Sequence, residues 1–249
     1  MIAFDDDSYP TFGRLRDATP EARKQAARAV KALEVKGGTN IHGALLHALE
    51  VLGDEKQGRP RAIVFLTDGQ GDTPPDVVLA DVRERAGSVR IYSVGAGEGV
   101  HRSFLERLAE DNRGTATFVT DTRDLGESMK RLYARIAMPL LVDLDLDFSG
   151  LATSAMYPKK LPDLYRDGEV IVVGRYKPGA GTITLRGRAQ DGAKQVSLPV
   201  TLPADEPKHA HLEKLWASRR VSSLLSTIAL RGDEPELVQE VTRLGIVYD

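Results

Sequence analysis

The stretch that most constrains the fold is Arg61 to Gly71, RAIVFLTDGQG. Its residues 62–67 form a continuous apolar run, which is typical of a β-strand buried on both faces of a parallel sheet. In open sheets of this kind, ligands bind beyond the carboxyl ends of the strands. We therefore expect Asp68, which directly follows the run, to lie at a ligand-binding edge.

Helical and strand patterns alternate on both sides of this run. Helix signals begin at Thr19-Pro20-Glu21 and after Asn40, and again at Pro74-Pro75, around 104–108 and at 125–136. Further strands are expected at residues 1–5, 89–94 and 115–119. Such alternation predicts an α/β fold with a doubly wound, mostly parallel sheet.

The pattern changes at Met138-Pro139, where apolar and polar residues begin to alternate strictly. Strands are expected at 140–148, 169–173, 182–189 and 195–202, followed by helices at about 208–230 and from Pro235. Gly245 is expected to stop the last helix, and Ile246 to Asp249 to begin a strand. The predicted parts are an α/β domain (1–138), a smaller antiparallel β module (139–205) and a helical segment running into a truncated strand (206–249).

Composition excludes several classes of function. The net charge of -2 provides no field for nucleic acid and no basic face for a membrane surface. The absence of Cys excludes disulfides and thiolate zinc sites. No apolar run approaches the roughly 18 residues that a transmembrane helix needs, and no signal-peptide pattern opens the chain. Both ends interrupt expected strands, so we expect a fragment of a longer protein.

Two loops at the expected sheet edge carry oxygen ligands. Thr39 lies in the loop Lys36 to Asn40, KGGTN, and Asp68 ends the apolar strand. A hydroxyl and a carboxylate suit a hard cation such as Mg²⁺, which takes oxygen ligands in a near-octahedral shell. Two other interpretations remain open: Thr39 caps the following helix, and Asp68-Gly69 is an ordinary strand-end turn.

The segments GGTN, IVFLTDG and IYSVGAG, in this order, resemble a von Willebrand factor type A domain. The resemblance implies Mg²⁺ or Mn²⁺ at a metal-ion-dependent adhesion site built from three loops, namely a D-x-S-x-S, a Thr and an Asp. Thr39 matches the Thr and Asp68 matches the Asp. The implied function is non-enzymatic adhesion, in which a carboxylate of a protein or extracellular-matrix ligand completes the metal's coordination.

Two later segments, 157–176 (YPKKLPDLYRDGEVIVVGRY) and 212–224 (LEKLWASRRVSSL), resemble the region after the A domain in inter-alpha-trypsin-inhibitor heavy-chain-like proteins. That resemblance implies a VIT domain in the same parent protein and an extracytoplasmic location.

The D-x-S-x-S loop is the departure from the family pattern. Asp6-Asp7-Ser8-Tyr9-Pro10 has D-x-S but places Pro10 where a second Ser is required. The family's loop follows its central first strand, which we expect before Met1. Without that strand, residues 2–4 and 63–67 would flank a gap of unpaired backbone groups, each costing about 1–3 kcal/mol. We therefore expect a fragment, or a gap that closes or borrows a strand, and weak or absent metal binding by this chain.

Two other functions are possible from sequence. Asp68 and Asp72 could hold a metal for hydrolysis, although the chain has no G-x-S-x-G, Walker or H-E-x-x-H motif, which favours a non-enzymatic role. Alternatively, the α/β domain is a metal-free scaffold, and the β module with the C-terminal helices carries the interaction.

The remaining candidate motifs favour structural roles. Asp143, Asp145 and Asp147 lack the Gly and the twelfth-position acid of a calcium loop, which indicates a solvated strand face. The series Gly95-x-Gly97-x-Gly99 does not have the dinucleotide spacing. Surface positions are expected for His42, His47 and the pair Arg219-Arg220, and a core position for Trp216. His209 and His211 alternate near a helix start and have no third metal ligand nearby.

Overall fold

The computed structural model describes residues 1–249 except 35–36, 54–59, 167, 210 and 249. Lys36 of the expected Thr39 loop and Asp249 of the expected last strand therefore lie outside the described residues. The chain forms two compact units: Met1–Asn112 with Ala116–Thr122, and Arg113–Thr115 with Arg123–Asp249. The sequence instead divides the chain at 138/139, whereas the structure groups the helix at 125–136 with the second unit.

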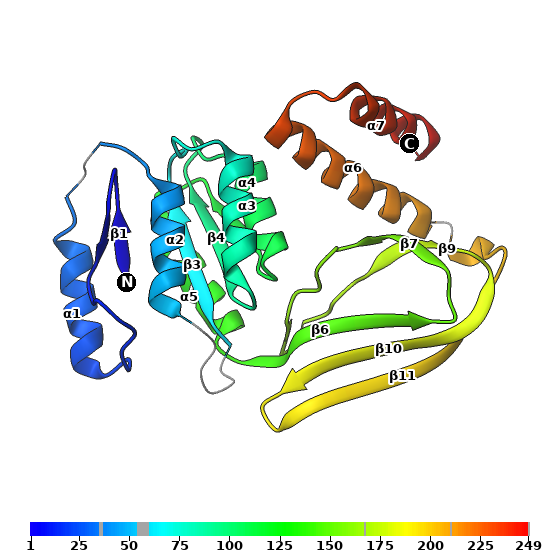
Figure 1. Ribbon diagram of the computed structural model, residues 1–249, viewed down its shortest axis with the longest axis horizontal. Helices are drawn as coiled ribbons and strands as arrows, with labels where there is room; N and C mark the ends of the chain where they lie inside the picture. The colour runs from blue at the N-terminus through cyan, green and yellow to red at the C-terminus, as the bar shows by residue number, and fades with distance from the viewer. Residues whose placement is uncertain (35–36, 54–59, 167, 210, 249) are drawn as a thin grey trace. The chain divides into compact units, whose positions relative to one another are not determined.

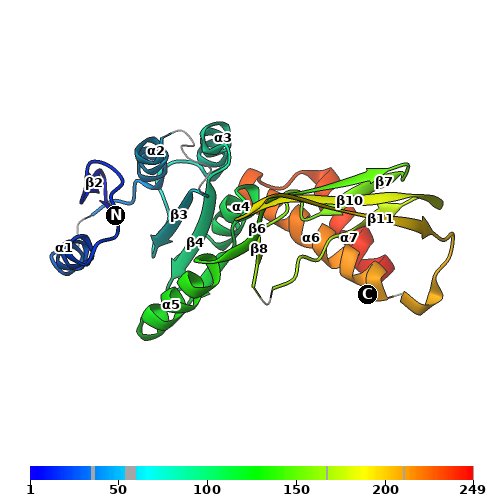
Figure 2. The ribbon, with the colours of Figure 1, turned by 90° about the horizontal axis from the view of Figure 1, so that it is seen from below.

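The first unit is the α/β part (Figures 1 and 2). Its elements are β1 (Ile2–Phe4), β2 (Ser8–Pro10), α1 (Pro20–Lys31), α2 (Ile41–Leu52), β3 (Ala62–Thr67), α3 (Pro75–Ala86), β4 (Arg90–Ala96), α4 (Arg102–Asp111) and β5 (Ala116–Val119). Strands β3, β4 and β5 form a parallel sheet in that order, as the alternation predicts.

Helices α2, α3 and α4 lie side by side, each packed against the next, and α4 contacts β4 and β5. Their apolar faces and strand β4 form the core of the first unit, in which Val82, Ile91 and Leu108 are 0% exposed. All seven residues of β4 are buried, because this central strand is paired on both edges and packed against α4.

Strand β3 differs from its prediction. Only Phe65 and Thr67 are buried, whereas Val64 is 42% and Leu66 39% exposed. The apolar run predicts burial on both faces, but within the described residues one face of β3 is not covered. Helix α1 likewise has its expected cap at Thr19, yet none of its residues is buried.

Strand β1 pairs antiparallel with β2 and not with β3, although the rings of Phe4 and Phe65 stack with centroids 5.7 Å apart. In the described part of the chain, β3 is therefore the edge of its sheet. The expected closing of the gap beside β3 is not observed.

The second unit contains mostly antiparallel strands and the C-terminal helices. A 3₁₀ turn (Thr122–Asp124) spans the boundary between the units along the chain. The elements after it are α5 (Leu125–Ile136), β6 (Pro139–Ser149), β7 (Thr153–Tyr157), β8 (Leu164–Tyr165), β9 (Val173–Tyr176), β10 (Gly179–Ala189), β11 (Gly192–Leu202), a second 3₁₀ turn (Pro207–His209), α6 (His211–Arg231) and α7 (Pro235–Tyr248). The sheet order is β11-β10-β6-β8, with β7 and β9 in a separate pair. Figure 1 shows β6, β10 and β11 running side by side as long curved strands.

Two predictions for this unit are wrong. The strand expected at 169–173 begins only at Val173, and the chain instead forms the short strands β8 and β9 on either side. The strand expected to begin at Ile246 is the end of helix α7, which continues through Gly245 to Tyr248. Trp216 explains this continuation, because its ring packs edge-on against Tyr248 with centroids 6.1 Å apart. Among the described residues, no helix has the length and apolar content to cross a bilayer.

Candidate functional site

The loop before α2 presents Thr39 without using it as a cap. The residue that caps α2 is Asn40, whose side-chain oxygen accepts a hydrogen bond from the Gly43 backbone N–H at 2.7 Å. Thr39 is half-buried, and no described residue forms a hydrogen bond with its hydroxyl. The capping interpretation of Thr39 is therefore wrong, and its hydroxyl remains available to a ligand.

In the turn after β3, the carboxylate of Asp68 also has no partner among the described residues. The Thr67 hydroxyl stabilises this turn, because it accepts a hydrogen bond from the Gly69 backbone N–H at 3.3 Å. Asp68 itself is exposed, and no described residue pairs with its carboxylate. The interpretation as an ordinary strand-end turn therefore does not explain the Asp68 side chain, because Thr67 makes the side-chain hydrogen bond of this turn.

These two loops meet at the carboxyl edge of the sheet. A Cβ atom placed on Gly69 would lie 3.3 Å from Thr39 Oγ1, and one on Gly71 would lie 3.1 Å from Ile41 Cβ. The third loop at this edge, after β4, touches the same region. A Cβ on Gly99 would lie 3.5 Å from the Asp68 carbonyl oxygen, and the Gln70 amide donates to the Gly99 carbonyl at 3.2 Å.

The acidic turn between β1 and β2 packs against the Thr39 loop. The Asn40 backbone N–H donates to the Asp5 carbonyl at 2.7 Å, and the Asn40 side-chain amide donates to the Asp6 carbonyl at 3.0 Å. A Cβ on Gly38 would overlap the Asp6 carboxylate. A hydrogen bond with Asp5 raises the pKa of Tyr9, and the neighbouring carboxylates of this turn act in the same direction.

Ser8, the serine of the incomplete D-x-S, is used elsewhere: its hydroxyl lies 2.6 Å from His47 Nδ1. The two residues line an open cavity of about 660 Å³ at the start of β2 and along α2. Sequence reasoning missed this contact, because residues 39 positions apart carry no local signal of pairing.

The donors present do not complete a metal site by themselves. Among the described residues, no group of three or more His, Asp or Glu side chains is placed to hold a metal ion. Thr39 and Asp68 would supply two oxygen ligands, whereas Mg²⁺ requires six from protein and water. Asp72, the second carboxylate of the hydrolase alternative, is exposed, and no described residue pairs with it.

Cross-strand ion pairs account for the D-x-D-x-D series on β6. The Asp143 carboxylate lies 2.8 Å from the Arg188 guanidinium. The Arg186 guanidinium lies 3.7 Å from Asp145 and 3.5 Å from Asp147. This strand face is polar, as predicted, and its acids are partly neutralised by β10.

The predictions of surface positions are wrong for His42, His47 and Arg220. His42 pairs with Asp81 of α3 at 2.8 Å, and His47 contacts Ser8, so both half-buried histidines connect α2 to other elements. The Arg220 guanidinium donates to the Tyr157 hydroxyl at 2.9 Å. The pattern of a helix surface predicts that an arginine is exposed, but it does not show which residue of another element that arginine contacts.

Comparison with known proteins shows what the first unit is similar to. Residues 1–118 match the family model described as von Willebrand factor type A domain. Human inter-alpha-trypsin inhibitor heavy chain H6 is 33% identical over 174 residues, which cover 65% of this chain and 13% of that protein. Human heavy chain H4 is 27% identical over 271 residues, covering 100% of this chain and 29% of the relative. The chain thus spans less than a third of either relative's length.

Solved structures show the same fold. A von Willebrand factor type A protein from Catenulispora acidiphila superposes with a TM-score of 0.67 at 18% identity, covering 99% of this chain and 70% of that one. The ArnB paralog VWA2 from Sulfolobus acidocaldarius gives a TM-score of 0.53 at 16% identity, covering 98% and 67%. Both matches extend over the second unit as well as the first.

Proposed function

The chain carries a von Willebrand factor type A domain of the kind found in inter-alpha-trypsin inhibitor heavy chains, and from this premise we propose that it is a non-enzymatic module for binding protein ligands. The finer proposal is that Thr39 and Asp68 belong to a divalent-metal site that recognises a carboxylate of a protein or extracellular-matrix ligand. The further ligands of that site come from residues other than the described ones.

The observation that supports this proposal is that the side chains of Thr39 and Asp68 are both without a partner among the described residues. Thr39 and Asp68 lie on loops that touch at the carboxyl edge of the sheet, and no described residue pairs with either side chain. Polar side chains at such an edge bind ligands in open α/β sheets. A hydroxyl and a carboxylate suit Mg²⁺ or Mn²⁺, and the bound cation would supply the attraction for an anionic ligand.

The test measures binding of a glutamate-containing peptide to the protein in its natural length, in Mg²⁺ and in EDTA. We expect Asp68→Ala to abolish the Mg²⁺-dependent part of the binding. Asp72→Ala removes the same charge four residues away and is expected to leave that part intact. Loss in both variants would favour the hydrolase pair, and unchanged binding in Asp68→Ala would refute the metal-bridged contact.

A second measurement addresses the 249-residue chain alone. Titration calorimetry is expected to detect weak Mg²⁺ binding or none, because two oxygen ligands leave most of the coordination shell to water. Tight Mg²⁺ binding by this chain would contradict the proposed need for further ligands.

A further inference from the structure

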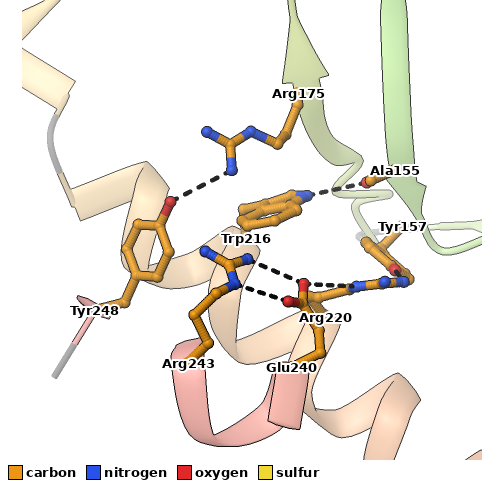
Figure 3. A network of polar contacts seen from close by, with 8 residues as sticks. All are labelled: Ala155, Tyr157, Arg175, Trp216, Arg220, Glu240, Arg243 and Tyr248. Atoms are coloured by element: carbon orange, nitrogen blue, oxygen red, sulfur yellow. Dashed lines mark hydrogen bonds and ion pairs between the residues drawn. The ribbon is translucent and has the colours of Figure 1, made fainter. Parts of the chain in front are cut away.

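A cluster of arginine and aromatic side chains lies where β7, β9, α6 and α7 meet in the second unit (Figure 3). Tyr157 and Arg175 come from the segment 157–176, and Trp216 and Arg220 from the segment 212–224. The two segments that resemble inter-alpha-trypsin-inhibitor heavy-chain-like proteins thus pack against each other. Helix α7 adds Tyr248.

Trp216 is held firmly within this cluster. Its side chain is 6% exposed, and its indole Nε1 donates a hydrogen bond to the Ala155 carbonyl at 3.0 Å. The Tyr248 ring packs edge-on against it. These contacts fix the plane of the indole ring.

Arg175 lies over that ring and remains exposed to solvent. Its guanidinium carbon is 4.7 Å from the centroid of the Trp216 ring, and its Nη1 donates to the Tyr248 hydroxyl at 3.4 Å. Figure 3 shows the guanidinium above the indole with its other nitrogens directed away from Tyr248. Stacking on a fixed ring orients the guanidinium before any partner binds.

Among the described residues, no carboxylate of the cluster pairs with this arginine. Glu240 pairs with Arg243 at 2.8 Å and with Arg220 at 3.9 Å, so one acid serves two arginines. The Arg243 hydrogen bond, with the nearby charges of Arg243 and Arg220, lowers the pKa of Glu240. Within the described residues, Arg175 has no acidic partner.

We propose that Arg175, oriented by Trp216 and Tyr248, is the docking point for a carboxylate of an acidic protein partner. A guanidinium presents paired N–H donors that match the two oxygens of a carboxylate. Arginine, tryptophan and tyrosine are also the residues that most often dominate protein–protein binding energy.

This site does not depend on the metal site of the first unit, so it is tested in EDTA. The probe is a hexaglutamate peptide, followed by the fluorescence of Trp216, which is the single tryptophan of the chain, and by calorimetry. We expect saturable binding that Arg175→Gln weakens roughly tenfold to a hundredfold, as for loss of hydrogen bonds to a charged group. Arg175→Lys is expected to bind less tightly than the wild type, because it keeps the charge but loses the planar fork.

Arg231→Gln is the matched control. It removes the same charge from an exposed residue at the other end of α6, about 22 Å from Trp216 along the helix. Circular dichroism verifies that each variant is folded. Equal binding by Arg175→Gln and Arg231→Gln would overturn the proposal.

Two further outcomes would also overturn it. One is an equal response to sodium sulfate at the same ionic strength, because it would show a site for simple anions only. The other is peptide binding that appears only in Asp249→Asn, because it would assign Arg175 to the Asp249 side chain of the same molecule rather than to a partner.

Discussion

Asn40→Ala is the substitution that best tests how the proposed metal-binding loop is built. Asn40 makes two side-chain hydrogen bonds: its oxygen caps α2 at Gly43, and its amide donates to the Asp6 carbonyl. Losing an N-cap costs about 1 kcal/mol, and losing a hydrogen bond costs about 1 kcal/mol. We therefore expect the free energy of unfolding of the first unit to fall by about 2 kcal/mol.

Two companion variants separate these contributions. Asn40→Asp keeps an oxygen for the cap but loses the amide donor, so we expect about half of the loss. Thr39→Val removes only a hydroxyl that no described residue bonds, and a change within about 0.5 kcal/mol is expected.

The assay is urea unfolding followed by far-UV circular dichroism, because the only tryptophan lies in the second unit and does not report on α2. Unchanged m-values would show that the variants alter stability rather than the unfolded state. A larger loss in Thr39→Val than in Asn40→Ala would refute the reasoning, because it would make Thr39 the cap and remove its availability as a ligand.

Two further predictions concern charge and packing. The lowered pKa of Glu240 means that its ion pair with Arg243 stabilises the folded state above the ordinary glutamate pKa of about 4.3, and that this stabilisation is lost as pH falls through the lowered value. The urea midpoint is therefore expected to fall less steeply between pH 6 and pH 2 in Glu240→Gln than in Glu236→Gln, an exposed control on α7. Equal falls of the midpoint in the two variants would contradict this. Gly95→Ala places a Cβ 2.9 to 3.1 Å from three apolar side chains and should cost about 1–3 kcal/mol in urea unfolding, whereas Gly126→Ala, with open space around it on α5, should not destabilise.

Local patterns in the sequence predicted most of the first unit. Apolar residues three and four apart identified α2, and paired prolines marked the start of α3. Thr39 and Asp68 were found because the parallel-sheet topology brings loops from different strands to one edge. Whether they bind a metal stays a prediction, since the described residues supply only two ligands.

The errors share one physical cause, which is that a pattern does not show what lies against it. Ile246 and Val247 favour a strand by propensity, but they end a helix because Tyr248 packs on Trp216. The apolar run predicts that Val64 and Leu66 are core residues, yet both are exposed. Their burial depends on whether another element covers β3, which the sequence of β3 does not specify.

The position of β3 at the edge of its sheet also bears on how the isolated chain behaves at high concentration. An edge strand offers unpaired backbone groups to other molecules, and proteins protect such strands with charge or proline. The other long edge strand, β11, contains Lys194 and Pro199, whereas β3 is AIVFLT and contains neither. Of these two edges, β3 is therefore the one through which intermolecular β-pairing and aggregation would begin, and covering it would keep the chain soluble as well as complete its sheet.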